Sequence, residues 1–255
     1  MPEVNAAIPG TFCWIELATS DRDGARNFYT SVFGWDANEN DMGGGMIYTI
    51  FRKNGRDVAA MYPLMPEQQQ QGVPPNWMSY VAVTSADDAA AKAQSLGATV
   101  HAPPFDVMDF GRMAVLQDPQ KAVFSVWQAK SNIGVTIRDE ANTLCWNELA
   151  TNDGNASRDF YSQLFGWTMK VSPEYTEIHL DGKGIGGIRT LNPGEPAPPN
   201  WMPYFLVDDV DATTAKAQAS GGRAYMPPTD MQGVGRFAVL ADPQGAVFAL
   251  YKSAH

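Results

Sequence analysis

The sequence has few cysteines, few histidines, and no long apolar or basic run. Among its 255 residues, two are Cys and three are His. Two cysteines cannot form the disulfide framework of a small secreted scaffold, so we expect reduced thiols. No stretch approaches the ~20 apolar residues of a membrane span, and residues 1–5 show no secretory signal. These absences predict a cytoplasmic protein with no membrane partner.

The charge balance argues against nucleic acid. Lys and Arg number 18, Asp and Glu number 28, and the net charge is −10. A phosphate backbone is bound by clustered Lys and Arg, and this acidic chain has no basic run. An apolar content of 44% with 18% charged residues is typical of globular chains. We therefore expect a folded protein with no nucleic-acid partner.

An internal repeat is the strongest signal that the sequence does contain. Thirteen of 24 positions are identical between FCWIELATSDRDGARNFYTSVFGW at 12–35 and LCWNELATNDGNASRDFYSQLFGW at 144–167. Two further pairs follow in the same order: PPNWMSYVAV at 74–83 with PPNWMPYFLV at 198–207, and GRMAVLQDPQKAVF at 111–124 with GRFAVLADPQGAVF at 235–248. Solenoid repeats have periods of ~20–50 residues, whereas this period is as long as a whole domain.

The repeat predicts two tandem domains. Domain 1 is expected over residues 1–130 and domain 2 over 143–255. The segment 131–142 has no counterpart in either copy, so we expect an exposed linker with a short extended stretch at 133–137. In copy one, the Pro- and Gln-rich segment 66–72 is expected to be a surface loop.

Each copy divides again into two similar units. Residues 11–19 alternate like a strand. Residues 21–33 place Ala25, Phe28, Tyr29, Val32 and Phe33 on one face of an amphipathic helix. Strands are expected near 35–38, 46–52 and 57–62. A strand at 77–84, a helix at 87–96 and strands near 98–102, 112–117 and 122–128 then repeat this order. The sequence therefore predicts an α+β fold with four βαβββ units.

The pattern xWxELxTxDxxxAxxFYxxxFGW, followed by a second unit and GRxAVLxDPQxAVF, resembles the vicinal oxygen chelate superfamily. This is the glyoxalase, bleomycin-resistance and extradiol-dioxygenase group, and the two-copy arrangement is similar to its bacterial glyoxalase-like and hydroxylase-like members. The resemblance covers nearly the whole chain and implies paired βαβββ units that curl into a cup around a small molecule. It implies little about the reaction, because one fold can host several chemistries.

Enzymes of this family bind one divalent ion through His and Glu on the first and last strands of the units. The family register places other residues at those positions: Trp14, Trp146, Met78, Met202, Ser125 and Ala249. None of the six is a good ligand for such an ion. His101, His179 and His255 have no partner at ligand spacing. We therefore expect no metal and no other cofactor.

The residues expected to face the cups follow from strand alternation and the family register. Trp14, Glu16 and Ala18 share one face of the first strand, opposite Cys13, Ile15 and Leu17. The resemblance turns the Trp14 face into the cup. The predicted ligand-binding residues are Trp14, Glu16, Met78, Tyr80, Trp146, Glu148, Met202 and Tyr204.

The two inward carboxylates have two interpretations. A carboxylate in an aromatic cup is costly unless it is paired or used, so Glu148, and after it Glu16, is the best candidate for a general base or a cation anchor. Alternatively, both are structural residues that fix strand ends or pair with Arg112 and Arg236. The two arginines could instead hold a ligand carboxylate, although a salt bridge at a strand edge is favoured.

Other repeated residues are expected to be structural. Cys13 and Cys145 are interpreted as packing residues on the helix-facing side. Trp35 and Trp167 are expected in the core. Trp77 and Trp201 either line the cup rim or seal the seam between units.

Two classes of function remain. The favoured one is binding of a small aromatic or cationic ligand in a cup with a degenerate metal site, and the alternative is a metal-dependent lyase, dioxygenase or hydroxylase with non-standard ligands. A monomer is favoured over a homodimer, because the fused copies can cover each other. We also expect the C-terminal cup to be the larger, since Gly184-Ile185-Gly186-Gly187 replaces Asp57-Val58-Ala59-Ala60 and leaves room for a ligand.

Overall fold

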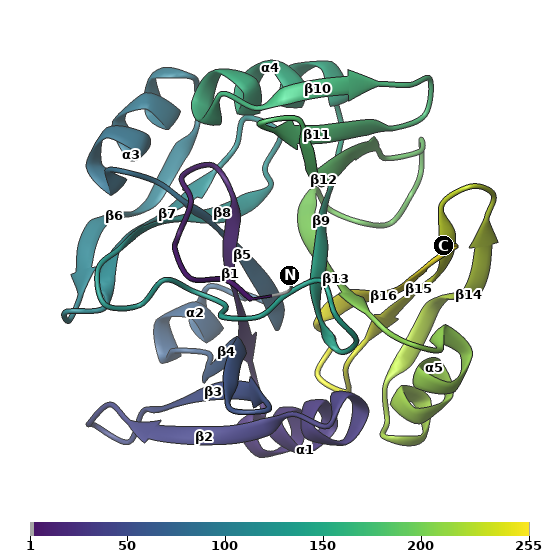
Figure 1. Cartoon of the computed structure of the whole chain (residues 1–255). Coiled ribbons are helices and arrows are strands. Elements are labelled where there is room, and N and C mark those ends of the chain that lie inside the picture. The colour runs from purple at the N-terminus through teal and green to yellow at the C-terminus, as the bar shows by residue number, and fades with distance from the viewer. Residues whose placement is uncertain (1–2, 255) are drawn as a thin grey trace.

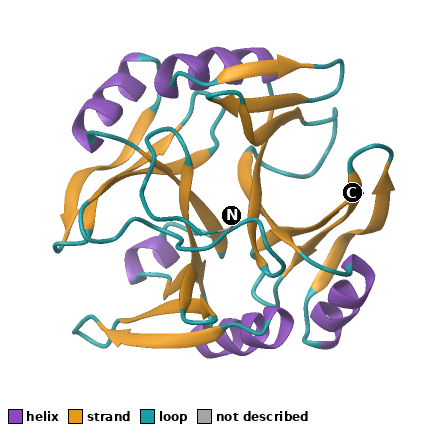
Figure 2. Ribbon diagram, viewed as in Figure 1, coloured by secondary structure: helices purple, strands orange, loops and turns teal. Residues whose placement is uncertain are grey.

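Two β-sheets with helices packed against them make up the protein (Figure 1, Figure 2). The computed structural model describes residues 3–254. Each sheet has eight strands, β1 to β8 in the first and β9 to β16 in the second. None of the helices in the described part of the chain is both long and apolar enough to cross a membrane.

The elements of the first copy are β1 (Phe12–Thr19), α1 (Arg22–Phe33), β2 (Asp36–Asp41), β3 (Ile47–Lys53), β4 (Arg56–Pro63), α2 (Pro66–Gln70), β5 (Asn76–Ala82), α3 (Ala86–Ser95), β6 (Thr99–Val107), β7 (Gly111–Gln117) and β8 (Val123–Ala129). Those of the second copy are β9 (Thr143–Thr151), α4 (Gly154–Phe165), β10 (Thr168–Val171), β11 (Thr176–Leu180), β12 (Lys183–Thr190), β13 (Asn200–Leu206), α5 (Val210–Ala219), β14 (Arg223–Met231), β15 (Gly235–Ala241) and β16 (Val247–Ser253).

Four βαβββ units build the two sheets, which confirms the expected α+β fold. The first sheet has the order β2-β3-β4-β1-β5-β8-β7-β6, so each unit forms one half, and the halves meet where β1 runs antiparallel to β5. The second sheet repeats this order from β10 to β14. The segment expected as a loop at 66–72 differs, because it contains the short helix α2 with Pro66 in its first turn.

The repeated block at 12–35 forms the strand and the capped helix that its pattern predicts. The side chain of Asp21 accepts a hydrogen bond from the backbone N–H of Gly24 at 3.0 Å and caps α1. Gly34 ends the helix with a φ of 69°, a left-handed conformation that glycine adopts without strain. Asp153 and Gly166 cap α4 in the same way. The two caps therefore fix both helices against the sheets at equivalent places.

The two hydrophobic cores are each shared between the domains. One core joins α1, β1, β3 and β4 of the first copy to β13, α5, β15 and β16 of the second. The other joins α3, β7 and β8 to α4, β11, β12 and the start of β13. Figure 1 shows the outcome, with α1 beside α5 at the bottom and α3 beside α4 at the top. The helix-bearing face of each domain is therefore covered by the other domain.

Paired hydrogen bonds cross between the domains inside these cores. Tyr29 on α1 donates to Asp242 Oδ2 at 3.0 Å and accepts from the indole of Trp77 at 3.0 Å. Tyr161 on α4 donates to Asp118 Oδ2 at 2.9 Å and accepts from Trp201 at 2.9 Å. The repeated Phe-Tyr, Asp-Pro-Gln and Pro-Pro-Asn-Trp motifs therefore meet at the domain interface.

Trp35, Trp77, Trp167 and Trp201 all lie in the cores. Trp35 and Trp167 are 3% and 2% exposed, as expected. Trp77 and Trp201 are also buried there, so they seal the core rather than line a cup rim.

The segment 131–142 was expected to be exposed, and this expectation is wrong. Val135 and Ile137 are 1% and 6% exposed. The backbone N–H of Val135 donates to the carbonyl of Cys13, and that of Thr136 donates to the carbonyl of Asp57. The segment therefore lies between the starts of β1 and β4. Direct pairing of these two strands begins only further along, at Glu16 and Ala60. The segment's alternating apolar residues are buried by this insertion.

Candidate functional site

The face of each sheet that carries no helix holds a separate cluster of aromatic and sulfur-containing side chains. We call the cluster on the first sheet the N-terminal cup, formed by Trp14, Glu16, Tyr48, Tyr62, Met78, Tyr80, Met113, Ser125 and Trp127. We call its counterpart the C-terminal cup, formed by Trp146, Glu148, Tyr175, Arg189, Met202, Tyr204, Phe237 and Ala249. The structure places all eight predicted ligand-binding residues in these two clusters.

The carboxylate of Glu16 is the polar centre of the N-terminal cup. Tyr48 donates its hydroxyl to Glu16 Oε1 at 2.6 Å, and Tyr80 donates to Oε2 at 2.7 Å. The indole of Trp14 hydrogen-bonds to Tyr48 in turn. Burial raises the pKa of Glu16 above its ordinary value, although the two tyrosine hydrogen bonds oppose this effect. Glu16 is thus held in a hydrogen-bonded chain of aromatic residues.

Glu148 occupies the same position in the C-terminal cup with different electrostatics. Tyr175 and Tyr204 hydrogen-bond to it, and Trp146 donates to Tyr175 at 3.0 Å. In addition, Arg189 Nε lies 3.3 Å from Glu148 Oε1. Burial raises the pKa of Glu148, and the positive charge of Arg189 is the largest opposing effect. This carboxylate therefore already has a cationic partner.

Strand register identifies the residues that make this difference. Arg189 pairs with Ala150 on β9, and Tyr62 pairs with the equivalent Ala18 on β1. Tyr62 therefore stands where the C-terminal cup has its arginine. Arg189 is itself oriented by Glu195, which accepts two hydrogen bonds from the guanidinium at 2.7 and 3.1 Å. Glu195 belongs to the segment before β13.

The glycines of β12 do not leave room for a ligand, so the expectation based on them is wrong. A Cβ on Gly187 would collide with the hydroxyl and ring of Tyr175. A Cβ on Gly184 would come within 3.3 Å of the ring of Trp146. The space is filled by side chains of the cup itself, and Gly187 lets Tyr175 reach Glu148.

The residues of the cups do not fit a divalent metal ion. Within residues 3–254, no group of three or more His, Cys, Asp or Glu side chains is placed to hold one. Glu16 and Glu148 are the carboxylates of the cups, and tyrosine hydroxyls already bind both. His179 contacts Glu177 at 3.0 Å on β11, and among the described residues no third side chain of these types joins this pair. His255 lies outside the described residues.

The arginines that could have held a ligand form salt bridges that run from the starts of β7 and β15 to the first turns of α3 and α5. Arg112 makes two hydrogen bonds to Asp87, at 2.7 and 2.9 Å, and Arg236 makes two to Asp211, at 2.6 and 2.8 Å. Neither pairs with Glu16 or Glu148, so the expected pairing of the carboxylates with these arginines is wrong, whereas the interpretation of both as hydrogen-bonded structural residues stays open. Arg189 is the arginine that does pair with Glu148, and strand alternation alone does not identify it.

The two cysteines are packing residues, but on the face opposite to the expected one. Cys13 is the extra residue of a β-bulge between Phe12 and Trp14, and Cys145 occupies the equivalent bulge. A bulge breaks strict alternation, so both thiols pack with the cup residues. Burial raises the pKa of Cys13 to about 12. Such a thiol stays protonated at neutral pH and is a poor nucleophile.

The sequence reasoning missed Tyr48, Tyr62, Tyr175 and Arg189. One signal was present for two of them, because Tyr48-Thr49 and Tyr175-Thr176 form a repeated dipeptide between the aligned blocks. Both dipeptides occupy equivalent positions in the register, since Thr49 pairs with Met61 and Thr176 pairs with Ile188. The dipeptide is too short to be recognised without knowing that register.

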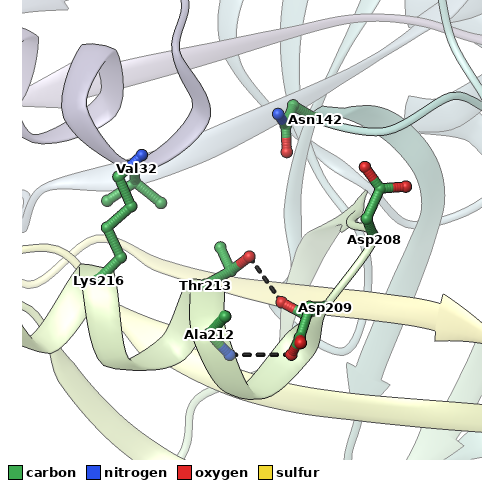
Figure 3. A pocket seen from close by; sticks show the side chains of 7 residues that line it. All are labelled: Val32, Asn142, Asp208, Asp209, Ala212, Thr213 and Lys216. Atoms are coloured by element: carbon green, nitrogen blue, oxygen red, sulfur yellow. Dashed lines mark hydrogen bonds between the residues drawn. The ribbon is translucent and has the colours of Figure 1, made fainter.

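The structure has two cavities lined by residues other than the aromatic and acidic side chains of the cups. One, of about 240 Å³, lies between α1 and the start of α5, where Lys216 runs toward Val32 (Figure 3). Its polar groups cap α5, because Asp209 accepts from Ala212 N at 2.9 Å and from Thr213 Oγ1 at 2.7 Å. The other, of about 110 Å³, lies between the N-terminal segment and residues 133–138. Neither contains a predicted site residue.

Comparison with known proteins places this geometry in a family. The model of the glyoxalase/bleomycin resistance protein/dioxygenase superfamily matches residues 11–126 and 143–250. The protein provisionally named glyoxylase CFP32 of Mycobacterium tuberculosis is 41% identical over 261 residues, covering 100% of this chain and 99% of that protein. The anthracycline biosynthesis protein DnrV of Streptomyces peucetius is 32% identical, covering 95% and 93%.

Solved structures share the fold at low sequence identity. The Mn(II)-bound glyoxalase from Novosphingobium aromaticivorans matches with a TM-score of 0.68 at 15% identity, covering 97% of this chain and 83% of that one. The 2,3-dioxygenase LapB from Pseudomonas sp. KL28 matches with a TM-score of 0.67 at 13% identity, covering 98% and 94%. These similarities establish the fold and leave the chemistry to the residues of the cups.

Proposed function

The chain belongs to the glyoxalase/bleomycin resistance protein/dioxygenase superfamily, and from this premise we propose that it binds a small aromatic or cationic organic ligand in a cup without using a metal ion. The observation that carries this proposal is the pair of hydrogen-bonded Trp–Tyr–Glu–Tyr chains on the helix-free faces. They include Trp14 and Trp146, two positions that the family register assigns to ion ligands, and they offer aromatic faces and one carboxylate instead of a set of metal ligands.

The chemistry of these walls favours an aromatic ligand. Tryptophan, tyrosine and methionine offer flat, polarisable surfaces that bind rings and cations. Trp14, Tyr48 and Met78 lie together in the cluster on the helix-free face, outside the helix-side cores. Two relatives are named for anthracycline biosynthesis, and anthracyclines contain fused aromatic rings. We also propose a cytoplasmic location, where the free Cys13 and Cys145 stay reduced.

The second candidate is a metal-dependent lyase, dioxygenase or hydroxylase. It is favoured by the name of the mycobacterial relative and by the glyoxalase and dioxygenase structures with this fold. Against it stands the donor set, because Glu148 is paired with Arg189 and the other ligand positions are Trp, Met, Ser or Ala.

Metal analysis of the purified full chain, before and after chelation, separates the two candidates. On the favoured proposal no metal is retained at one ion per chain, and quenching of tryptophan fluorescence by aromatic compounds is the same with and without chelator. One tightly held Mn, Fe, Ni or Zn ion per chain, whose removal abolishes binding, would favour the enzyme.

A further inference from the structure

The two cups differ in how their buried carboxylates are neutralised. Glu148 has the guanidinium of Arg189 at 3.3 Å. Glu16 has Tyr62 at that register position, and within residues 3–254 no Lys, Arg or His forms an ion pair with it. Tyrosine hydroxyls stabilise a carboxylate by hydrogen bonding but bring no positive charge. The N-terminal cup therefore contains a buried acid with no countercharge.

A second polar group in the N-terminal cup is also unsatisfied. Ser125 is 0% exposed, and its hydroxyl has no hydrogen-bond partner among the described residues. Its neighbours Phe124 and Val126 point into the helix-side core, and Trp127 belongs to the cup. Because side chains alternate along a strand, Ser125 points into the cup, where it pairs in register with Tyr80. Buried polar groups without partners are rare in folded proteins and call for an explanation.

The C-terminal cup has neither of these features. Ala249 replaces Ser125 and is packed in the cup cluster. Arg189 neutralises Glu148 and is itself held by Glu195. Tyr175 fills the space over Gly187. Glu148 and Arg189 are thus neutralised by groups of the chain itself.

We propose that the N-terminal cup binds a small aromatic compound that carries a protonated amine, with the ammonium group on Glu16, and that the C-terminal cup does not bind it. This inference rests on the proposed function and names its ligand class and its cup. The ammonium supplies the positive charge that Arg189 supplies in the other copy. Trp14, Trp127 and the ring of Tyr48 line the same cluster and hold the aromatic part, with cation–π contacts to the amine.

Other ligand classes fit the N-terminal cup less well. A neutral aromatic compound leaves Glu16 without a countercharge. An anionic compound meets the carboxylate directly and approaches a chain of net charge −10. A protonated amine neutralises the charge of Glu16, and the negative net charge of the chain attracts it over a long range.

The test uses two probes of the same shape and different charge, 2-naphthylmethylamine and 2-naphthylmethanol. Isothermal titration of the full chain at pH 7 is expected to show one amine site per chain, at least tenfold tighter than the alcohol. In Glu16→Gln this preference falls to less than threefold. The matched control Glu148→Gln keeps it, provided that circular dichroism shows both variants folded.

Two exchanges between the cups test the same idea without changing either carboxylate. Tyr62→Arg gives Glu16 the cation that Glu148 has, and is expected to abolish the amine preference. Arg189→Tyr removes that cation from the C-terminal cup, and is expected to create a second amine site. These two variants keep both glutamates, so they test the inference even if Glu16→Gln does not fold.

Three results would overturn the inference. Loss of amine preference in Glu148→Gln but not in Glu16→Gln would assign the site to the other cup. Equal binding of amine and alcohol to the parent chain would reject the ligand class, while leaving aromatic binding, and so the proposed function, in place. Binding of neither probe would reject the inference and the proposed function together.

Discussion

A single neighbour decides the electrostatics of each buried glutamate. Glu16 and Glu148 occupy equivalent strand positions, each bound by two tyrosine hydroxyls. Tyr62 and Arg189 occupy equivalent positions in the two copies. Glu148 therefore forms an ion pair with Arg189, whereas Glu16 has no positively charged partner at that position. Residue-level experiments should therefore compare the two copies, because each copy is the other's control.

Glu16→Gln is expected to stabilise the ligand-free protein increasingly as the pH rises. The groups that face Glu16 are Tyr48, Tyr62 and Tyr80, and burial raises its pKa in the folded state above the ordinary 4.5. The fold therefore binds this proton more tightly than the unfolded chain does, and stability is lost as pH rises from below 4.5 through the folded pKa. Urea denaturation between pH 4 and 8 measures the difference.

Glu148→Gln is the control for that experiment. It removes the same burial penalty but also breaks the contact with Arg189, so its stabilisation at pH 8 should be smaller than that of Glu16→Gln. A larger gain for Glu148→Gln would contradict the assignment of the uncompensated acid.

Ser125→Ala is expected to stabilise the ligand-free chain by about 1 kcal/mol, since an unpaired buried hydroxyl costs ~1–3 kcal/mol. The reverse change in the other copy, Ala249→Ser, should destabilise by a similar amount. Thermal unfolding of both variants checks the pair. A destabilised Ser125→Ala would mean that the hydroxyl has a partner in solution.

At the scale of elements, two equivalent sets of hydrogen bonds hold the domains together, one around Asp242 and Tyr29 and one around Asp118 and Tyr161. Asp242 Oδ1 accepts from three backbone N–H groups, those of Gln244, Gly245 and Ala246, at 2.8 to 3.0 Å. Its other oxygen accepts from Tyr29 on α1. The Asp-Pro-Gln turn between β15 and β16 is thereby fixed to a helix of the other domain, and Asp118 with Tyr161 repeats the arrangement.

Tyr29→Phe should therefore destabilise the whole molecule and not only α1. A hydrogen bond to a charged group contributes ~1.5–3 kcal/mol, and we expect a loss in this range with a single cooperative transition. Tyr161→Phe should give a similar value. Two separated transitions in calorimetry would show that the domains unfold independently.

Gly187→Ala tests how β12 and Tyr175 fit together. The added Cβ would overlap Tyr175, and overpacking of this kind costs ~1–3 kcal/mol. The matched change Ala60→Gly, at the equivalent position of β4, should cost less than ~1 kcal/mol. Chemical denaturation compares the two. Equal costs would mean that Tyr175 moves away freely.

At the scale of the whole molecule, the sequence predicted the four units because their motifs recur in order. Their pairing could not be predicted, since nothing in a periodic pattern says that α1 packs with α5 rather than with α3. The bulges at Cys13 and Cys145 also escape alternation arguments. The candidate site was only half found, because the partners of each glutamate come from strands distant in sequence.

Mutual covering of the helix-bearing faces leads us to expect a monomer. Each shared core is complete within one chain, so no second copy is needed to bury it. Light scattering at micromolar concentration should give a mass near 27.8 kDa. A stable tetramer would contradict this expectation.

The shared cores also set an order of events during synthesis. Chains leave the ribosome N-terminus first, and domains usually fold as they emerge. Here α1 is complete at Phe33, yet its core includes Phe205, Phe248 and Leu250 near the other end of the chain. The first core can therefore close only when translation is nearly finished. Until then the apolar face of α1 in the nascent chain is exposed and accessible to chaperones. A ribosome stalled before β16 would hold a chain in which the apolar face of α1 cannot be buried.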